Sequence, residues 1–187
     1  MTITPFPRRT MLLGAAAAAL LPMQQAVAQT SLAGGDWFQM VQAHHALIAQ
    51  TLEEVVGSGE ASGSRRARSL NKLAYQLTAH SVAEENVLYP ALAMNGMTKE
   101  SDMLYIDQSH AKVLNAEIDM AAAMNSPGSA WLDKAKALQA AILKHAKEDE
   151  EASLYPRLQQ AGGPALQTRL TMLYQSQFSS VRPSRVV

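Results

Sequence analysis

The chain has 187 residues, with 16 basic and 16 acidic side chains and no cysteine. This charge balance argues against a nucleic-acid partner, which usually needs a basic face. The lack of cysteine excludes disulfides, thiolate metal sites and cysteine nucleophiles, so any metal must be held by nitrogen and oxygen. Aliphatic residues and alanine dominate and aromatic residues make up 5%, which favours a helical protein.

The first 28 residues have the features of an export signal. Arg8 and Arg9 precede an apolar run over residues 11–21, and an A-x-A cleavage motif follows at residues 26–28. The run is too short and too rich in alanine for a stable membrane anchor, and nothing in the mature chain is apolar enough to span a bilayer. The paired arginines resemble a twin-arginine signal, so we expect export to the periplasm by that route rather than ordinary secretion or an uncleaved anchor.

After a short linker over residues 29–35, residues 36–160 predict one domain of four long helices. Asp36 can cap the first helix, with Gln39 in the capping-box position. Loop signals separate the helices at residues 57–64, 95–96 and 125–128. Short loops between long helices favour antiparallel neighbours, so the sequence predicts an all-α, up-down-up-down four-helix bundle.

The C-terminal extension, residues 161–187, begins with Ala-Gly-Gly-Pro. The spacing of Leu166, Leu170 and Leu173 predicts a short fifth helix followed by a polar tail. The sequence assigns no function to this extension.

Each of the four long helices carries one histidine in its apolar series, where residues recur at intervals of three and four. These histidines are His45, His80, His110 and His145. On the third helix the same series includes Met103, Ile106, Val113 and Met120. At a rise of about 1.5 Å per residue, counting from the helix ends places the four imidazoles within about 3 to 5 Å of one level.

A single core histidine is most often a structural residue with a hydrogen-bond partner. Four at one level are different, because buried imidazoles without partners are costly and only carboxylates share their faces. The pattern therefore predicts a metal site. His44 lies about 100° around the helix from His45 and is expected to be exposed, with an accessory role at the site as the alternative.

Two similar segments supply the carboxylates, HSVAEENVLYP over residues 80–90 and HAKEDEEASLYP over residues 145–156. In the first, Glu84 follows its histidine by four residues and points the same way. In the second, ideal helix geometry selects Asp149, whereas alignment on Leu-Tyr-Pro selects Glu150 and requires a one-residue π-bulge. Both remain candidates, with the repeat favouring Glu150.

The sequence gives the neighbouring acidic residues and the two tyrosines no part in metal binding. Glu85, Glu148 and Glu151 are expected to be solvated. Tyr89 and Tyr155 are expected to pack at the end of the bundle.

Four imidazoles and two carboxylates exceed what one tetrahedral zinc ion requires and suit two metal ions. With bridging carboxylates and an oxide or hydroxide bridge, about two coordination positions would remain for outside ligands. The surplus charge of two Fe²⁺ ions favours an added anion such as hydroxide, superoxide or peroxide. We therefore expect two iron ions, in preference to zinc or manganese.

These histidines and acidic residues, with each acidic motif followed by Leu-Tyr-Pro, resemble the hemerythrin-like (HHE cation-binding) domain over about residues 36–160. The resemblance implies a four-helix bundle around a non-haem di-iron centre. Oxygen-carrying members have a second histidine one turn before the third-helix ligand, where this chain has Ile106. The ligand count is closer to that of iron-centre repair proteins, whose cysteine-bearing N-terminal region this chain lacks.

We therefore expect an exported di-iron protein that binds oxygen or nitric oxide for sensing, buffering or stress protection. A binding protein is favoured over an enzyme. The alternatives are a peroxidase- or oxidase-like enzyme that acts on peroxide or oxygen at the same centre, and an iron-storage or iron-centre repair protein.

Overall fold

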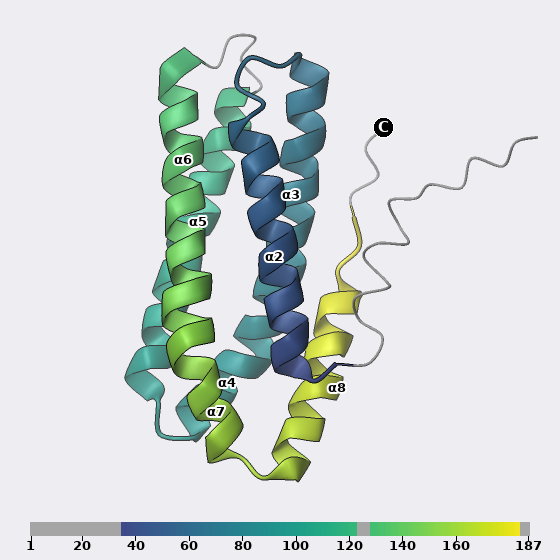
Figure 1. The fold of residues 1–187 in the computed structure, drawn as a ribbon, viewed down its shortest axis with the longest axis vertical. Coiled ribbons are helices and arrows are strands. Elements are labelled where there is room, and N and C mark those ends of the chain that lie inside the picture. Colours follow the sequence, from purple (N-terminus) through teal and green to yellow (C-terminus); the bar gives the residue numbers. More distant parts are fainter. Residues whose placement is uncertain (1–34, 123–127, 184–187) are drawn as a thin grey trace, which may run out of the picture.

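The computed structural model describes residues 35–122 and 128–183. These residues are helical, with no strand among them, and four long helices lie lengthwise beside one another (Figure 1). The prediction of an all-helical bundle is confirmed. The expected export signal and the linker as far as residue 34 lie outside the described residues.

Seven α-helices and two π-helical segments form the described part of the chain. The long helices are α2 (Trp37–Val56), α3 (Gly63–Ala83), α5 (Thr98–Ala122) and α6 (Gly128–Lys144). The π-helical segment η1 (Glu84–Leu88) joins α3 to the short α4 (Tyr89–Met94), and η2 (His145–Leu154) joins α6 to α7 (Tyr155–Ala161). The last helix is α8 (Pro164–Ser180). None of the helices within the described residues is both long and apolar enough to cross a membrane.

The capping box expected at the start of the first helix is present. The Asp36 carboxylate accepts a hydrogen bond from the Gln39 backbone N–H at 2.9 Å, and the Gln39 side chain accepts one from the Asp36 N–H at 3.2 Å. This pair satisfies two groups that would otherwise lack partners at a helix start.

Both copies of the internal repeat contain a π-helical turn immediately before proline. The Tyr89 N–H donates to the Glu84 carbonyl, and the Tyr155 N–H donates to the Glu150 carbonyl, each across five residues. Proline follows at once, and because it lacks an N–H and crowds the carbonyl four residues earlier, it disfavours a regular α-helical turn there. The expected bulge in the second copy is confirmed, and the first copy has one as well.

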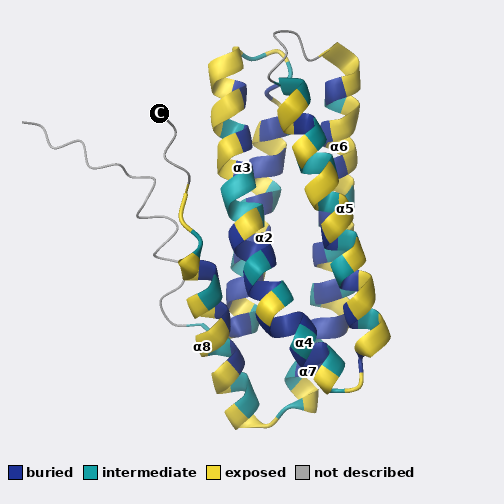
Figure 2. Cartoon of the chain, turned by 180° about the vertical axis from the view of Figure 1, so that it is seen from behind, coloured by how far each residue is buried: buried dark blue, intermediate teal, exposed yellow. Residues whose placement is uncertain are grey.

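The core has two apolar clusters with a polar level between them. One cluster includes Trp37, Leu88, Leu92, Leu158 and Leu170, near the end of the bundle where α4 and α7 lie. The other includes Leu52, Leu73, Ile118, Trp131 and Leu138. Figure 2 shows the buried residues of the long helices gathered on their inward faces. The polar level is enclosed by these clusters, so its side chains are shielded from water.

The third helix presents a different face from the one its sequence suggested. The residues expected inside are exposed: Met103 at 61%, Ile106 at 67%, Val113 at 55% and Met120 at 72%, and His110 is exposed as well. The buried residues of α5 are Ser101, Leu104, Gln108 and Ile118. Apolar residues occur on both sides of this helix, so periodicity alone could not identify the inner one. The prediction that His110 points into the core is wrong.

The predicted fifth helix is present and packs against the bundle. Leu170, Tyr174 and Phe178 are the buried residues of α8, which contacts α2, α3 and η1. Trp37 anchors α8 through two hydrogen bonds, from its indole N–H to the Gln167 side chain at 2.6 Å and from its backbone N–H to Thr171 Oγ1 at 3.1 Å. The C-terminal extension is thus part of the folded unit.

The observed face of α5 predicts unequal effects for two isoleucines. Ile118→Ala should lower the free energy of unfolding by about 2–5 kcal/mol, because Ile118 is 0% exposed and its loss leaves a cavity. Ile106→Ala should change it by less than about 0.5 kcal/mol, because that side chain faces solvent. Urea unfolding followed by circular dichroism measures both. A larger loss for Ile106→Ala would contradict the assigned face.

Candidate metal centre

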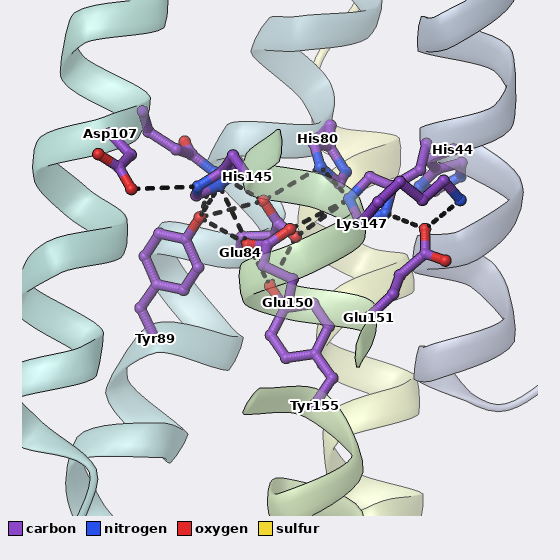
Figure 3. A network of polar contacts seen from close by, with 12 residues as sticks. His44, His80, Glu84, Tyr89, Asp107, His145, Lys147, Glu150, Glu151 and Tyr155 are labelled. Carbon is purple, nitrogen blue, oxygen red and sulfur yellow. Dashed lines mark hydrogen bonds and ion pairs between the residues drawn. The ribbon is translucent and has the colours of Figure 1, made fainter. Parts of the chain in front are cut away.

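Five side chains from three stretches of the chain meet at the polar level. Figure 3 labels four of them, His80, Glu84, His145 and Glu150. His45 comes from α2, His80 and Glu84 from α3 and η1, and His145 and Glu150 from η2. Glu84 and Glu150 are 0% exposed, and the side chain of His145 is 11% exposed. His45, His80, Glu84 and Glu150 each offer a ligand atom within 4.8 Å of the others. Such a buried cluster can bind a metal.

The Nε2 atoms of the three histidines face the two carboxylates. The Nε2 atoms of His45 and His80 lie 3.1 Å apart. His80 Nε2 is 3.1 Å from Glu84 Oε2, and His45 Nε2 is 3.2 Å from Glu150 Oε2. On the other side of the carboxylates, His145 Nε2 is 3.2 Å from Glu150 Oε1. His45 and His80 therefore form a pair, and His145 stands alone.

The outer nitrogen of each imidazole faces an oxygen atom. His45 Nδ1 lies 2.7 Å from Glu151 Oε1, and His80 Nδ1 lies 3.1 Å from the Tyr174 hydroxyl. His145 Nδ1 is buried without a hydrogen-bond partner among the described residues, and Asp107 Oδ2 is 3.8 Å away. An outer oxygen favours the proton on Nδ1 and leaves the Nε2 lone pair free to bind a metal. Glu151, expected to be solvated, instead supports His45.

The tyrosines of the two Leu-Tyr-Pro motifs point into the site. The Tyr89 hydroxyl lies 3.3 Å from Glu84 Oε2, 3.0 Å from Glu150 Oε1 and 3.1 Å from His145 Nε2. The Tyr155 hydroxyl lies 2.7 Å from Glu84 Oε1 and 2.8 Å from Glu150 Oε1. The expectation that these residues serve only to pack the bundle end is wrong, because their hydroxyls hold both carboxylates in place.

Gln108 occupies the position on the third helix where a histidine was expected. Its Nε2 donates to Glu84 Oε2 and to the Tyr89 hydroxyl, both at 2.6 Å. Its Oε1 is buried and has no hydrogen-bond partner within the described residues. The third helix thus supplies an amide to the site, while His110 lies on the outer surface.

The second repeat brings Glu150 into the site and leaves Asp149 outside. Glu150 lies among the imidazoles because the π-helical turn of η2 adds one residue after His145. The side chain of Asp149 is 31% exposed and accepts a hydrogen bond from Lys144 at 2.7 Å. Asp149, Asp107 and the outer side of His145 form a second, partly exposed group within 4.8 Å.

In the metal-free protein, protons on the imidazoles and on one carboxyl group compensate the negative charge that the buried carboxylates would carry. Burial, followed by the charge of Glu150, raises the pKa of Glu84 to about 8. Burial opposes protonation of His45, but the adjacent carboxylates of Glu150 and Glu151 outweigh it and raise its pKa to about 9. Burial is likewise outweighed for His145, where the charge of Glu150 and a hydrogen bond to it raise the pKa to about 9.

The donor set fits a cation better than it fits these protons. Glu150 Oε2 is buried without a hydrogen-bond partner among the described residues, although His45 Nε2 is close. Three imidazole nitrogens and two carboxylates are the ligand types that iron, manganese and zinc accept. Because the carboxylates lie between His145 and the other two imidazoles, the residues can serve more than one ion.

His44 is buried, contrary to the expectation that it is exposed. Its Nδ1 lies 2.9 Å from the Tyr174 hydroxyl, and its ring stacks on Phe178 at a centroid distance of 3.8 Å. Burial, with the nearby charge of His45, lowers the pKa of His44 to about 3, so the ring is neutral. Sequence periodicity missed this role because α8 covers the side of α2 on which His44 lies.

A cavity of about 40 Å³ adjoins the three imidazoles on the side away from the tyrosines. Its polar lining includes His45, His80, His145, Gln108 and, toward solvent, Asp107 and Lys112. Its apolar lining consists of Leu77, Ala111, Ala141, Ile142 and Ala146. This space can admit a water molecule or a ligand of a few atoms.

Comparison with known proteins agrees with this geometry. Residues 38–158 match the family model described as the Hemerythrin HHE cation binding domain. All five converging side chains lie within the match, whereas α8 begins beyond it. No curated protein and no solved structure matches the chain.

Substitution of the two candidate carboxylates of the second repeat should weaken metal binding to different extents. Glu150→Gln should weaken binding of Co²⁺ by at least about 100-fold, beyond the 10- to 100-fold typical of residues that only support a ligand. Asp149→Asn should leave the affinity unchanged, because that carboxylate faces Lys144. Competition against a chromophoric chelator measures both. Equal losses, or a larger one for Asp149→Asn, would show that the wrong carboxylate was chosen.

Metal binding at pH 7 should release protons. His45 and His145, with pKa values of about 9, are protonated there in the metal-free protein, whereas a metal needs their neutral forms. The release should shrink as the pH rises above 9, because the protons have then already left. Calorimetric Zn²⁺ titrations in two buffers of different ionisation enthalpy reveal it. Identical heats in both buffers at pH 7 would contradict these charge states.

Proposed function

Because the chain belongs to the hemerythrin HHE cation-binding family, we propose that it is a non-haem di-iron protein that binds a small diatomic ligand. The observation that carries the proposal is the cavity of about 40 Å³ whose floor is formed by three candidate metal ligands. The proposed helix order is the antiparallel up-down-up-down arrangement that short loops favour.

The arrangement of donors supports two ions. His45 and His80 would hold one ion and His145 the other, with Glu84 and Glu150 shared between them. Mixed nitrogen and oxygen ligands suit iron, which supplies reversible redox chemistry and affinity for oxygen and nitric oxide. Since the third helix contributes Gln108 rather than an imidazole, an ion held by His145 would have fewer nitrogen ligands. This asymmetry would leave room for an outside ligand on that side.

The protein's own residues prepare the cavity for such a ligand. Ala111, Ala141 and Ile142 give it apolar walls, which disfavour bulk water and leave space for a molecule of two heavy atoms. The Gln108 amide oxygen, which has no partner in the part of the chain that the structure describes, supplies one buried hydrogen-bond acceptor near the same space. Tyr89 and Tyr155 hold the carboxylates and fix the positions of the metal ligands.

A second candidate function is a peroxidase-like enzyme at the same centre. It is favoured by the contact of two phenols, which can be oxidised, with the carboxylates of the site. Loss of hydrogen peroxide over many turnovers by the iron-loaded protein would favour this enzyme. Stoichiometric binding without turnover would favour the binding protein.

The proposal also includes export to the periplasm, on the basis of the paired arginines and cleavage motif in residues 1–28. Folded export would allow iron to be loaded before the protein leaves the cytoplasm. An oxygen or nitric oxide binding protein in that compartment would serve sensing, buffering or stress protection.

Filling the cavity should reduce ligand binding without removing metal. Ala141→Leu places a larger side chain in the cavity wall, whereas Ala140→Leu adds the same atoms on the exposed side of α6. After anaerobic loading with Fe²⁺, both variants should retain two ions per chain. Affinity for nitric oxide should fall at least about tenfold in Ala141→Leu alone, since overpacking costs about 1–3 kcal/mol.

Iron analysis and nitric oxide titration by absorbance measure the two quantities separately. Equal nitric oxide affinity in both variants would contradict the assignment of this cavity. Failure of the unaltered protein to retain iron would contradict the proposed cofactor.

A further inference from the structure

The C-terminal helix α8 places a hydroxyl directly behind one candidate metal ligand. Tyr174, which is 0% exposed, lies with its hydroxyl 3.1 Å from His80 Nδ1 and 2.9 Å from His44 Nδ1. The family match ends at residue 158, so this contact comes from outside the matched domain. Figure 1 shows α8 alongside the lower part of α2 and α3.

If His80 binds a cation, the three groups can form their hydrogen bonds in only one order. A metal bound to His80 Nε2 requires that the ring proton lie on Nδ1. The Nδ1–H group then donates a hydrogen bond to the Tyr174 oxygen. The single proton of Tyr174 is then donated to His44 Nδ1, which must be an acceptor. In the metal-bound protein the hydrogen bonds therefore run from His80 to Tyr174 to His44, and the Tyr174 oxygen supplies the acceptor that the metal-binding tautomer of His80 needs.

Without this hydroxyl, the other tautomer of His80 becomes the better one. A proton on Nδ1 would be buried with no acceptor, which is unfavourable. A proton on Nε2 could instead donate to Glu84 Oε2, which is 3.1 Å away. The proton on Nε2 would then occupy the nitrogen lone pair that the metal needs.

The rest of α8 fixes this chain of contacts independently of Tyr174. Phe178, one turn further along, stacks on His44 with an interplanar angle of 15°. Trp37 holds the start of the helix through Gln167 and Thr171. Removal of the Tyr174 oxygen alone should therefore leave α8 docked.

We infer that Tyr174 and His44 are positioning residues for His80, and that α8 completes the metal centre. The inference depends on the proposed function only in that His80 binds a cation. It does not depend on the identity of the metal or of the outside ligand.

The direct test is the tautomer of His80 in the metal-free protein, read from long-range ¹H–¹⁵N NMR spectra of the imidazoles. Tyr174→Phe should raise the fraction of His80 that carries its proton on Nε2, relative to the unaltered protein, because it removes the acceptor of the Nδ1 proton. Tyr75→Phe is the matched control, because Tyr75 packs in the same core and its hydroxyl makes no hydrogen bond within the described residues. An unchanged His80 tautomer in Tyr174→Phe would overturn the inference.

Cobalt binding provides the second readout. Tyr174→Phe should bind Co²⁺ about 10- to 100-fold more weakly, with altered visible d–d bands, while Tyr75→Phe matches the unaltered protein. At His44, asparagine retains an acceptor near the Nδ1 position and should preserve affinity, whereas His44→Leu should lower it. Equal losses in His44→Asn and His44→Leu would mean that the hydrogen bond is unimportant and would overturn the inference.

The two proposals fail in different ways. If the unaltered protein binds no Co²⁺ or Fe²⁺, the proposed function fails, and the NMR spectra still decide what Tyr174 does. If metal binds but Tyr174→Phe retains both tautomer and affinity, the role of α8 fails and the proposed function stands.

Discussion

Two carboxylates buried side by side are the constraint on which the rest of the structure depends. Glu84 and Glu150 are both 0% exposed, and neither can lose a proton there without nearby positive charge or hydrogen-bond donors. Three imidazoles, two phenols and one amide surround them and meet this requirement in the metal-free protein. A cation would compensate the two carboxylates more completely, because it would replace protons on imidazoles and a carboxyl group that already point inward.

The repeated Leu-Tyr-Pro motif explains how a helix can deliver such groups. Proline disfavours the regular α-helical turn before it, and in both copies the tyrosine five residues after the glutamate bonds to a carboxylate. In the second copy the π-helical segment also brings Glu150 toward the core, whereas Glu84 follows His80 with regular α-helical spacing. The π-helical turn and the support of a candidate ligand thus come from one short sequence. Both copies have the π-helical turn and the supporting tyrosine, which gives the centre its two similar halves.

Sequence periodicity predicted the bundle and the inward direction of His45, His80 and His145, because the apolar spacing on those helices is clear. The capping box was predicted separately, from the residue types at its two positions. Periodicity failed on the third helix, where apolar residues lie on both sides and polar contacts of Gln108 select the inner face. His44 and Tyr174 could not be predicted, because their meeting depends on how α8 docks against α2 and α3. The glutamate-to-tyrosine spacing shared by the two repeats was the unused signal for Tyr89 and Tyr155.

The most direct measurement is a crystal structure of the iron-loaded protein with anomalous diffraction data collected at the iron edge. We predict two anomalous peaks beside the buried carboxylates, one within bonding distance of His45 and His80 Nε2 and the other within bonding distance of His145 Nε2. Peaks confined to the partly exposed group of Asp107 and Asp149, or none near Glu84 and Glu150, would contradict this prediction.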